Sequence, residues 1–339
     1  MSINHNEIGS EFWSVPTAAD KNKLFGDGTS WFLSGRAALN AIIRDIKKIK
    51  TVKTAALPSY CCDSMIMPFI SNGIEVSFYA VCLENGALVQ KVDEEKEADV
   101  ILIMDYFGYV GDYKAPENAI IIRDLTHSVL CDFKKDADYY FGSLRKWAGF
   151  LTGGFAYKKD GSAIETAENE KESEYIALRR AAMEEKAEYI SGKSESKSYL
   201  ERFNEAEELL DCVFEGRGDS DDINSALYLD AQLIKEKRRE NAKELLKELS
   251  DYAIFKEVKN TDCPLFVPLY IENGKRNSLK KHLIEKSIYC PVHWPVSNYH
   301  KLNNDTAGLY ENEISIICDQ RYNAYDMQRI IKEIKEFLD

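Results

Sequence analysis

An acidic side chain and a lysine follow two neighbouring apolar stretches near the middle of the chain. The run Ala119–Ile122 predicts a short buried strand that leads to Asp124, with His127 three residues further on. A second short strand, predicted at residues 139–141, leads into the segment Ser143-Leu-Arg-Lys146. Because ligands of α/β proteins bind at the carboxyl ends of the strands, we expect these side chains to meet at one site.

The chemistry that suits this pair is that of pyridoxal phosphate. A carboxylate such as Asp124 keeps the pyridine nitrogen protonated, so that the ring withdraws electrons, and a lysine such as Lys146 forms the Schiff base. Each residue alone has a plainer interpretation, as a capping acid and as a surface lysine. The ordered set of Asp-x-x-His and then Ser-x-x-Lys is much less frequent by chance. It predicts pyridoxal 5′-phosphate as the cofactor and Lys146 as the catalytic residue.

A helix start further upstream suits the phosphate of such a cofactor. Apolar residues recur at helical spacing between residues 39 and 49, and Ser34 is placed as the N-cap. Free N–H groups and the helix dipole favour an anion at such a start. We therefore predict a phosphate cup formed by the amides of Gly35, Arg36 and Ala37, with a charge-assisted bond from Arg36. By itself, a Ser-Gly helix start is most often only a cap.

The order of the predicted elements indicates an α/β protein. Besides the two strands above, the sequence predicts strands at residues 54–60, 74–81 and 100–104. Helices are predicted between strands, so the central sheet should be mostly parallel and flanked by helices. The 339 residues are expected to form an arm at 1–30, a large α/β domain at 31–245 and a smaller C-terminal α+β domain at 246–339.

Composition argues against several classes of partner and site. The formal net charge of −13 disfavours a nucleic acid or an acidic membrane surface as the main partner. The eight cysteines show neither CxxC nor Cys/His metal-ligand spacing, so we expect reduced thiols and no metal. The first residues carry no signal-peptide pattern, and no run approaches about 18 apolar residues. We expect a soluble, cytoplasmic protein.

Three further stretches carry weaker signals. Residues 160–210 are charged and largely helical with a break near Ser191-Gly192, which favours a solvated connector over a binding surface. Residues 223–249 predict one long amphipathic helix that bridges the two domains. His293 and Trp294 lie between prolines in a loop and are candidate contacts to the substrate, although a packed loop histidine is the commoner outcome.

Together these motifs resemble the DegT/DnrJ/EryC1/StrS sugar aminotransferases, which are fold-type-I pyridoxal-phosphate enzymes. Ser34-Gly35-Arg36-Ala-Ala-Leu resembles the family's Ser-Gly-Thr-x-Ala-Leu phosphate cup. Ile122-Arg-Asp124-Leu-Thr-His127 is similar to its Glu-Asp-Ala-Ala-His segment. Ser143-Leu-Arg-Lys146, followed by Gly153-Gly154, matches the Schiff-base lysine and its glycine-rich sequel.

The resemblance implies a homodimeric aminotransferase with active sites shared between subunits. It implies that Asp124 meets the pyridine nitrogen, that His127 lies by the ring and its 3-hydroxyl, and that Ser143 helps to hold the phosphate. Glutamate is the implied amino donor, and a nucleotide-linked keto sugar is the implied acceptor.

Three departures from the family pattern leave alternatives open. Cys62 stands where the family usually has an aromatic residue that stacks on the cofactor ring, so either Cys62 packs on the ring or Tyr60 or a neighbour replaces it. The Ser-x-x-Lys spacing is shorter than the commoner one. The Asn-x-Arg that reaches across the dimer is absent, and Arg217 or Ser220 is the candidate substitute.

Two other functions therefore stay open. One is a pyridoxal-phosphate enzyme that eliminates or dehydrates, although the retained Lys146 disfavours the sugar dehydratase branch, in which histidine replaces the lysine. The other is a cofactor-binding or regulatory protein without turnover.

Overall fold

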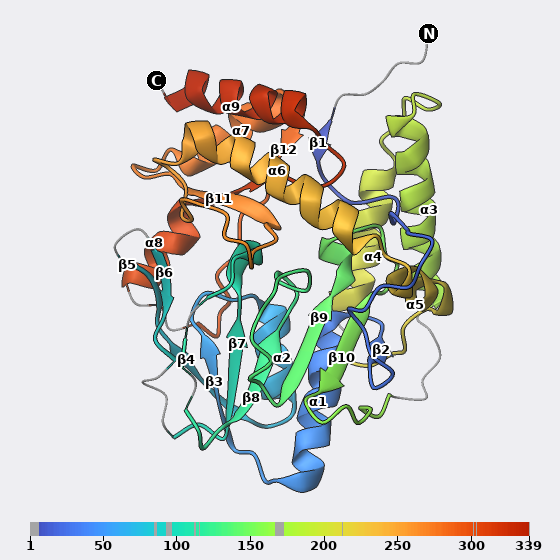
Figure 1. Ribbon diagram of the computed structural model, residues 1–339, viewed down its shortest axis with the longest axis vertical. Helices are drawn as coiled ribbons and strands as arrows, with labels where there is room; N and C mark the ends of the chain where they lie inside the picture. Colours follow the sequence, from blue (N-terminus) through green and yellow to red (C-terminus); the bar gives the residue numbers. More distant parts are fainter. Residues whose placement is uncertain are drawn as a thin grey trace.

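A seven-stranded sheet forms the base of the molecule, and a smaller group of helices and strands lies above it (Figure 1). The computed structural model describes residues 7–84, 87–92, 97–111, 113–114, 116–166, 173–211, 213–300, 302 and 304–338. Across the sheet the strands follow the order β2 (Ser30–Phe32), β10 (Gly154–Lys158), β9 (Tyr139–Ser143), β8 (Ile120–Asp124), β7 (Val100–Met104), β3 (Thr54–Pro58) and β4 (Glu75–Tyr79).

The sheet is mostly parallel, as predicted. Strands β4, β3, β7, β8 and β9 pair in parallel, while β10 and β2 at one edge pair antiparallel. The register aligns Met104 with Asp124, and Asp124 with Phe141. The carboxyl ends of β7, β8 and β9 therefore lie level, so the segments that follow them open toward one region.

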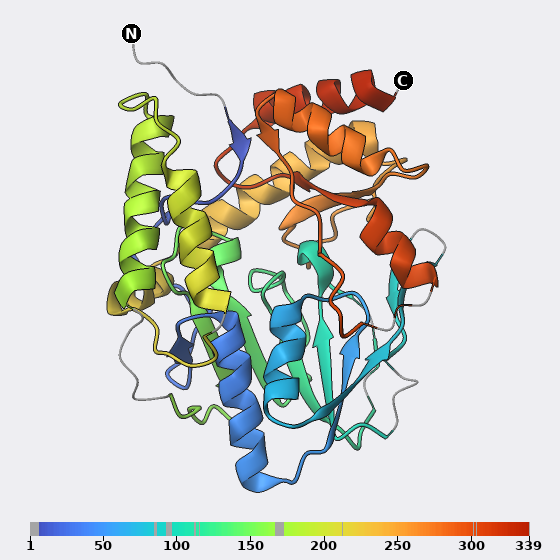
Figure 2. The ribbon, with the colours of Figure 1, turned by 180° about the vertical axis from the view of Figure 1, so that it is seen from behind.

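Other parts of the chain cover both faces of this sheet. All five residues of β7 are buried, as expected of a strand that is covered on both faces. Helices α1 (Gly35–Ile49) and α2 (Asp63–Ser71) cover the face turned toward the viewer in Figure 2. The Ser34 side chain caps α1 by accepting a hydrogen bond of 3.2 Å from the Ala37 N–H.

The smaller unit has an apolar core of its own, built around an antiparallel strand pair. Its elements are β11 (Phe266–Tyr270), β13 (Glu313–Ile317), β12 (Ile288–Tyr289), α7 (Arg276–Glu285), α9 (Ala324–Leu338) and the second half of α6 (Ala231–Leu249). Helix α8 (Asn304–Asn312) instead packs on the large unit, because Leu309 and Tyr310 belong to the core of the sheet. The hairpin β5 (Val81–Glu84) and β6 (Ala87–Gln90) lies beside α8.

The arm runs from the large unit to the small one. Its strand β1 (Ile8–Gly9) pairs in parallel with β12, and Ile8 is fully buried in the core of the small unit. The domain limits at residues 30 and 245 stay a prediction.

The prediction of a single long helix at residues 223–249 is wrong. The structure has two helices there, α5 (Ser220–Leu227) and α6, with a break between them. Leu229 forms an isolated β-bridge with Thr17 of the arm, and the Asp230 carboxylate caps the start of α6. Pairing with a segment distant in the sequence thus interrupts a stretch whose periodicity alone is helical.

The charged stretch at residues 160–210 contains two helices that pack against each other, α3 (Ser173–Ile190) and α4 (Tyr199–Asp211). Residues 191–198 separate them, which confirms the predicted break. Among the described helices, none combines the length and the apolar character that a membrane crossing requires.

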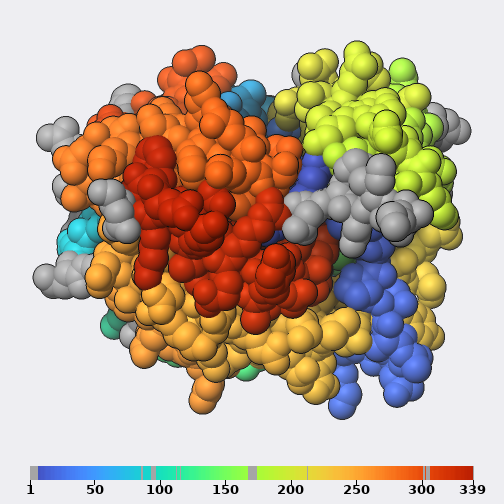
Figure 3. Space-filling view, turned by 90° about the horizontal axis from the view of Figure 1, so that it is seen from above, coloured from blue at the N-terminus to red at the C-terminus, as the bar shows by residue number. Residues whose placement is uncertain are grey.

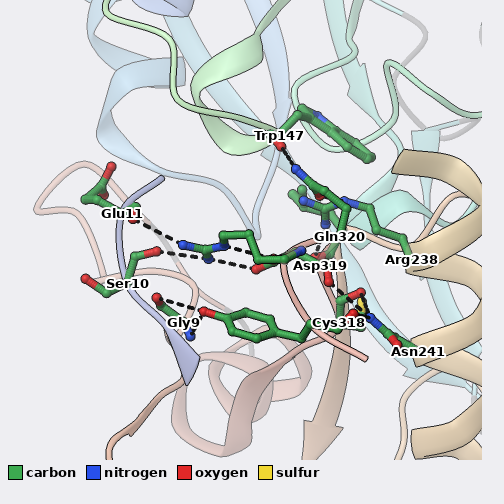
Figure 4. A network of polar contacts seen from close by, with 12 residues as sticks. Gly9, Ser10, Glu11, Trp147, Arg238, Asn241, Cys318, Asp319 and Gln320 are labelled. Atoms are coloured by element: carbon green, nitrogen blue, oxygen red, sulfur yellow. Dashed lines mark hydrogen bonds and ion pairs between the residues drawn. The ribbon is translucent and has the colours of Figure 1, made fainter. Parts of the chain in front are cut away.

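A polar network joins α6, the segment after β13 and Trp147 (Figure 4). Gln320 donates from Nε2 to the Trp147 carbonyl over 2.6 Å and accepts at Oε1 from Arg238 over 2.9 Å. Arg238 also donates to the Leu265 carbonyl over 2.8 Å, and its guanidinium carbon lies 4.8 Å from the centroid of the Trp147 ring. Because Trp147 directly follows Lys146, this network ties the small unit to the predicted catalytic lysine.

Replacing Arg238 with methionine should lower the free energy of unfolding by about 2 kcal/mol, because it leaves buried carbonyl and amide oxygens without a donor. Urea denaturation measures the change. Lys237→Met, at the neighbouring position of the same helix, where the side chain is 44% exposed, should stay within about 0.5 kcal/mol of the unsubstituted protein. Equal effects of the two substitutions would contradict a structural role for Arg238.

Candidate functional site

A cavity of about 230 Å³ opens at the carboxyl ends of β7, β8 and β9. All the predicted site residues line it except Ala37 and His293. Those that do are Gly35, Arg36, Cys62, Asp124, His127, Ser143, Lys146 and Trp294. The structure therefore brings together residues that come from five separate parts of the sequence.

Asp124 is the last residue of β8, and only 3% of it is exposed. One carboxylate oxygen accepts a hydrogen bond of 2.7 Å from the Thr126 N–H. Burial raises the pKa of Asp124 to about 6, although the bonds from Thr126 oppose this shift. In the described part of the chain no cation pairs with this carboxylate, so a protonated ring nitrogen in the cavity is the kind of partner that it lacks.

His127 follows Asp124 on the same loop and is also buried. Its Nδ1 accepts a hydrogen bond of 3.2 Å from the Phe107 N–H, so the neutral ring carries its proton on Nε2. Burial lowers the pKa of His127, and His293 and Lys146 lower it further. The Trp294 ring stacks on His127, with centroids 5.7 Å apart and planes inclined by 25°.

Lys146 ends the short 3₁₀ helix Leu144–Lys146 that follows β9. Its side chain lines the 230 Å³ cavity and also a second cavity of about 500 Å³. Burial lowers the pKa of Lys146, with opposing contributions from Glu11, which raises it, and Arg145, which lowers it. A lowered pKa favours the neutral amine, which is the form that bonds to a carbonyl carbon and accepts a proton.

The start of α1 forms the end of the cavity that was predicted to bind phosphate. The Ala37 amide already donates to the Ser34 side chain, so the amides of Gly35 and Arg36 are the ones left for an anion. The Arg36 guanidinium donates to the Leu210 carbonyl over 3.0 Å and pairs with Asp211 over 3.1 Å. Its Nε, however, is buried without a hydrogen-bond partner among the described residues.

Cys62 lines the cavity, and its Sγ lies 2.9 Å from the Ser64 Oγ. Burial raises the pKa of the Cys62 thiol, so it stays protonated. Tyr60 is fully buried and donates to the His293 carbonyl, which directs its hydroxyl away from this cavity. Within the described ranges, no group of three or more His, Cys, Asp or Glu is arranged to hold a metal ion.

Sequence reasoning missed four charged residues beside Lys146. Glu207 accepts hydrogen bonds from Arg145 and, over 3.0 Å, from Arg179. Arg179, whose side chain is fully buried, also pairs with Glu11 over 3.0 Å. Arg145 is the direct neighbour of Lys146 in the sequence, which is a usable signal. Glu11 and Glu207 gave none, because they lie in the arm and in the charged helical stretch.

The charged helical stretch is therefore more than a solvated connector. Glu207, Leu210 and Asp211 of α4 line the cavity that holds Asp124, and Glu207 also lines the larger cavity. His293 lies in the wall of that larger cavity, where its Nδ1 is 2.9 Å from the Ser315 Oγ.

The comparisons with known proteins identify the fold. The sequence matches no protein-family model and no curated protein. Solved structures do match. The PLP form of the putative sugar aminotransferase Spr1654 from Streptococcus pneumoniae has a TM-score of 0.64 at 15% identity, over 96% of this chain and 92% of that one.

Two further structures agree. PseC from Helicobacter pylori, an aminotransferase involved in the biosynthesis of pseudoaminic acid, gives a TM-score of 0.62 at 15% identity, over 97% of this chain and 99% of that one. A DegT DnrJ EryC1 StrS aminotransferase from Brucella abortus gives 0.61 at 17% identity, over 91% and 85%. This chain has their fold. The predicted fold-type-I architecture, with a mostly parallel sheet and a smaller α+β unit, is confirmed.

Replacing Asp124 with asparagine should stabilise the ligand-free protein near pH 7. An aspartate with a pKa of about 6 in the folded state and 3.8 otherwise loses stability as the pH rises from about 4 to 6. The asparagine variant escapes this loss, so its gain should grow from near zero at pH 4 to about 2–3 kcal/mol at pH 7.

Urea denaturation at several pH values measures this gain. Asp251→Asn, at an exposed carboxylate outside the cavity, reports the effect of the change of residue type alone. A gain that is the same at pH 4 and pH 7 would show that Asp124 does not carry a raised pKa.

Proposed function

We propose that this protein is a pyridoxal-phosphate-dependent aminotransferase that moves an amino group from a donor, glutamate, to the keto group of a nucleotide-linked sugar. The proposal rests on the buried Asp124, which no cation of the described residues pairs with. It lies in the same cavity as Lys146, at the sheet edge where α/β proteins bind ligands. The fold shared with solved sugar aminotransferases supports it.

The residues around the cavity fit this cofactor. Among the described residues Asp124 has no positive partner, and a protonated pyridine nitrogen would supply one. At the other end, the start of α1 offers the amides of Gly35 and Arg36, and Ser143 adds a hydroxyl. The Nε atoms of Arg36 and Arg145 are buried without a hydrogen-bond partner in the described part of the chain, as expected beside an anion site.

The mechanism assigns a task to each residue. When bound, the cofactor supplies an electron-withdrawing ring that stabilises negative charge at the carbon that loses or gains a proton. Lys146 would hold the cofactor covalently through Nζ, and once the amino donor displaces it, the freed Nζ amine would take a proton from the donor and deliver it to the cofactor. Asp124 would hold a proton on the ring nitrogen. The Nδ1 of His127 accepts from the Phe107 N–H, so its Nε2–H would be free to orient a ring oxygen.

Two aromatic or sulfur side chains are proposed to cover the cofactor. Cys62 stands at the position of the usual stacking residue, and Trp294, in the loop after β12, lines the same cavity. Trp294 therefore serves the cofactor, and His293, in the larger cavity, serves the substrate.

The visible spectrum of the protein with pyridoxal phosphate tests the proposal. We expect an absorption band that disappears in Lys146→Ala and persists in Lys159→Ala, an exposed lysine. Glutamate should shift the band toward that of pyridoxamine phosphate. A Lys146-dependent band that glutamate leaves unchanged would point to another donor or to elimination chemistry. The absence of any Lys146-dependent band would refute the proposal that the protein is a pyridoxal-phosphate enzyme.

We also propose a homodimer, as the family resemblance implies. Arg217 or Ser220 is then the candidate that reaches the partner's phosphate in place of the absent Asn-x-Arg. Light scattering should give about twice the 38.7 kDa mass of one chain. A mass of one chain at micromolar concentration would contradict it.

A further inference from the structure

The larger cavity has the opposite charge to the rest of the protein. It measures about 500 Å³, within the range of substrate pockets, and it extends from Lys146 to helix α7. Although the whole chain carries −13, the cavity wall contains six basic and four acidic side chains. The basic ones are Arg145, Lys146, Lys197, Arg238, Lys280 and Arg321, and the acidic ones are Glu7, Glu11, Glu207 and Asp319.

Every acidic side chain of this wall already has a basic partner. Glu7 pairs with Lys197, and Asp319 pairs with Arg321 over 2.8 Å. Glu11 and Glu207 are engaged by Arg179 and Arg145, as described above. Among the described residues that line the cavity, no carboxylate is therefore left to balance the remaining cations.

Two of the basic side chains have no partner in the described part of the chain, and they belong to different units. Lys146 is reserved for the cofactor by the proposed function. Lys280 lies on α7, where it is half-buried, and neither a hydrogen bond nor an ion pair engages it among the described residues. An ammonium at a cavity wall that the described residues leave without a counter-charge attracts an anionic ligand.

The surroundings of Lys280 suit a ligand that bridges the cavity. Ile284, on the same helix, is 43% exposed, and Leu200, at the start of α4, is 46% exposed. Both line the cavity, together with Tyr289, whose ring lies 5.8 Å from the Lys197 ammonium. Seen from above, the α3 region in lime and the α7 region in orange stand on either side of a hollow (Figure 3).

We propose that Lys280 binds a phosphoryl group of the acceptor substrate, so that the large cavity holds a sugar linked to a nucleoside diphosphate with its keto group toward Lys146. The inference rests on the proposed function. Lys280 is on the small unit and Lys146 on the large one, so the ligand that reaches both carries its anion away from its reacting carbon. The unpaired ammonium also draws an anionic substrate into the cavity of an acidic protein.

Binding of inorganic pyrophosphate, measured by calorimetry, tests this subsite. Because the start of α1 is also proposed to bind phosphate, each titration is made with and without saturating pyridoxal phosphate. Lys280→Gln should weaken pyrophosphate binding about tenfold in both conditions, since one charge-assisted bond is lost. Lys281→Gln, the exposed neighbour on the same helix, should leave the affinity unchanged.

Three results would overturn the assignment. The first is equal pyrophosphate affinity in Lys280→Gln and the unsubstituted protein, and the second is no saturable binding of pyrophosphate to either protein. The third is that Lys280→Gln weakens the binding of glutamate instead, which would make Lys280 a contact to the carboxylate of the amino donor. The visible spectrum distinguishes a failure of this subsite from a failure of the proposed aminotransferase function. Lys280-dependent pyrophosphate binding in a protein without a Lys146-dependent band would keep the subsite and refute the aminotransferase.

Discussion

Arg179 carries a full positive charge, and its side chain has no exposed surface. Removing such an ion from water costs several kcal/mol unless other groups replace the water. Here the replacement comes from Glu11, Glu207 and the Phe150 carbonyl, with the Phe203 ring at 5.4 Å. These groups belong to the arm, to α4 and to the loop after Lys146. The buried charge thus holds three distant segments around the site. Glu207 also accepts a hydrogen bond from Arg145, the neighbour of Lys146.

Asp124, in the 230 Å³ cavity, presents the reverse situation. Its carboxylate is nearly as deeply buried as Arg179, but the described residues give it hydrogen bonds and no counter-charge. The fold therefore tolerates an unfavourable buried group beside a network of ion pairs. Such a local conflict is expected where a side chain is kept for a ligand rather than for stability.

The main elements of the fold and the centre of the site were visible in the sequence because they depend on local patterns. A buried strand that ends in Asp124, and a second that leads to Lys146, are statements about neighbouring residues, and the parallel register then brings both to one edge. The break at Leu229 was not visible, because it depends on pairing with Thr17. Nor was the role of Glu207, because nothing in a charged amphipathic stretch tells which of its acids a buried arginine will select.

Strand β1 pairs with a strand that is synthesised much later in the chain. Ile8 pairs with Ile288 and is fully buried against residues from α6, α7, β13 and α9. A ribosome makes the arm first and its partner strand only near residue 288, so the arm waits through most of synthesis. Glu11, three residues beyond Ile8, pairs with Arg179 beside Lys146. A strand made among the first residues therefore completes its pairing only after most of the chain has been synthesised.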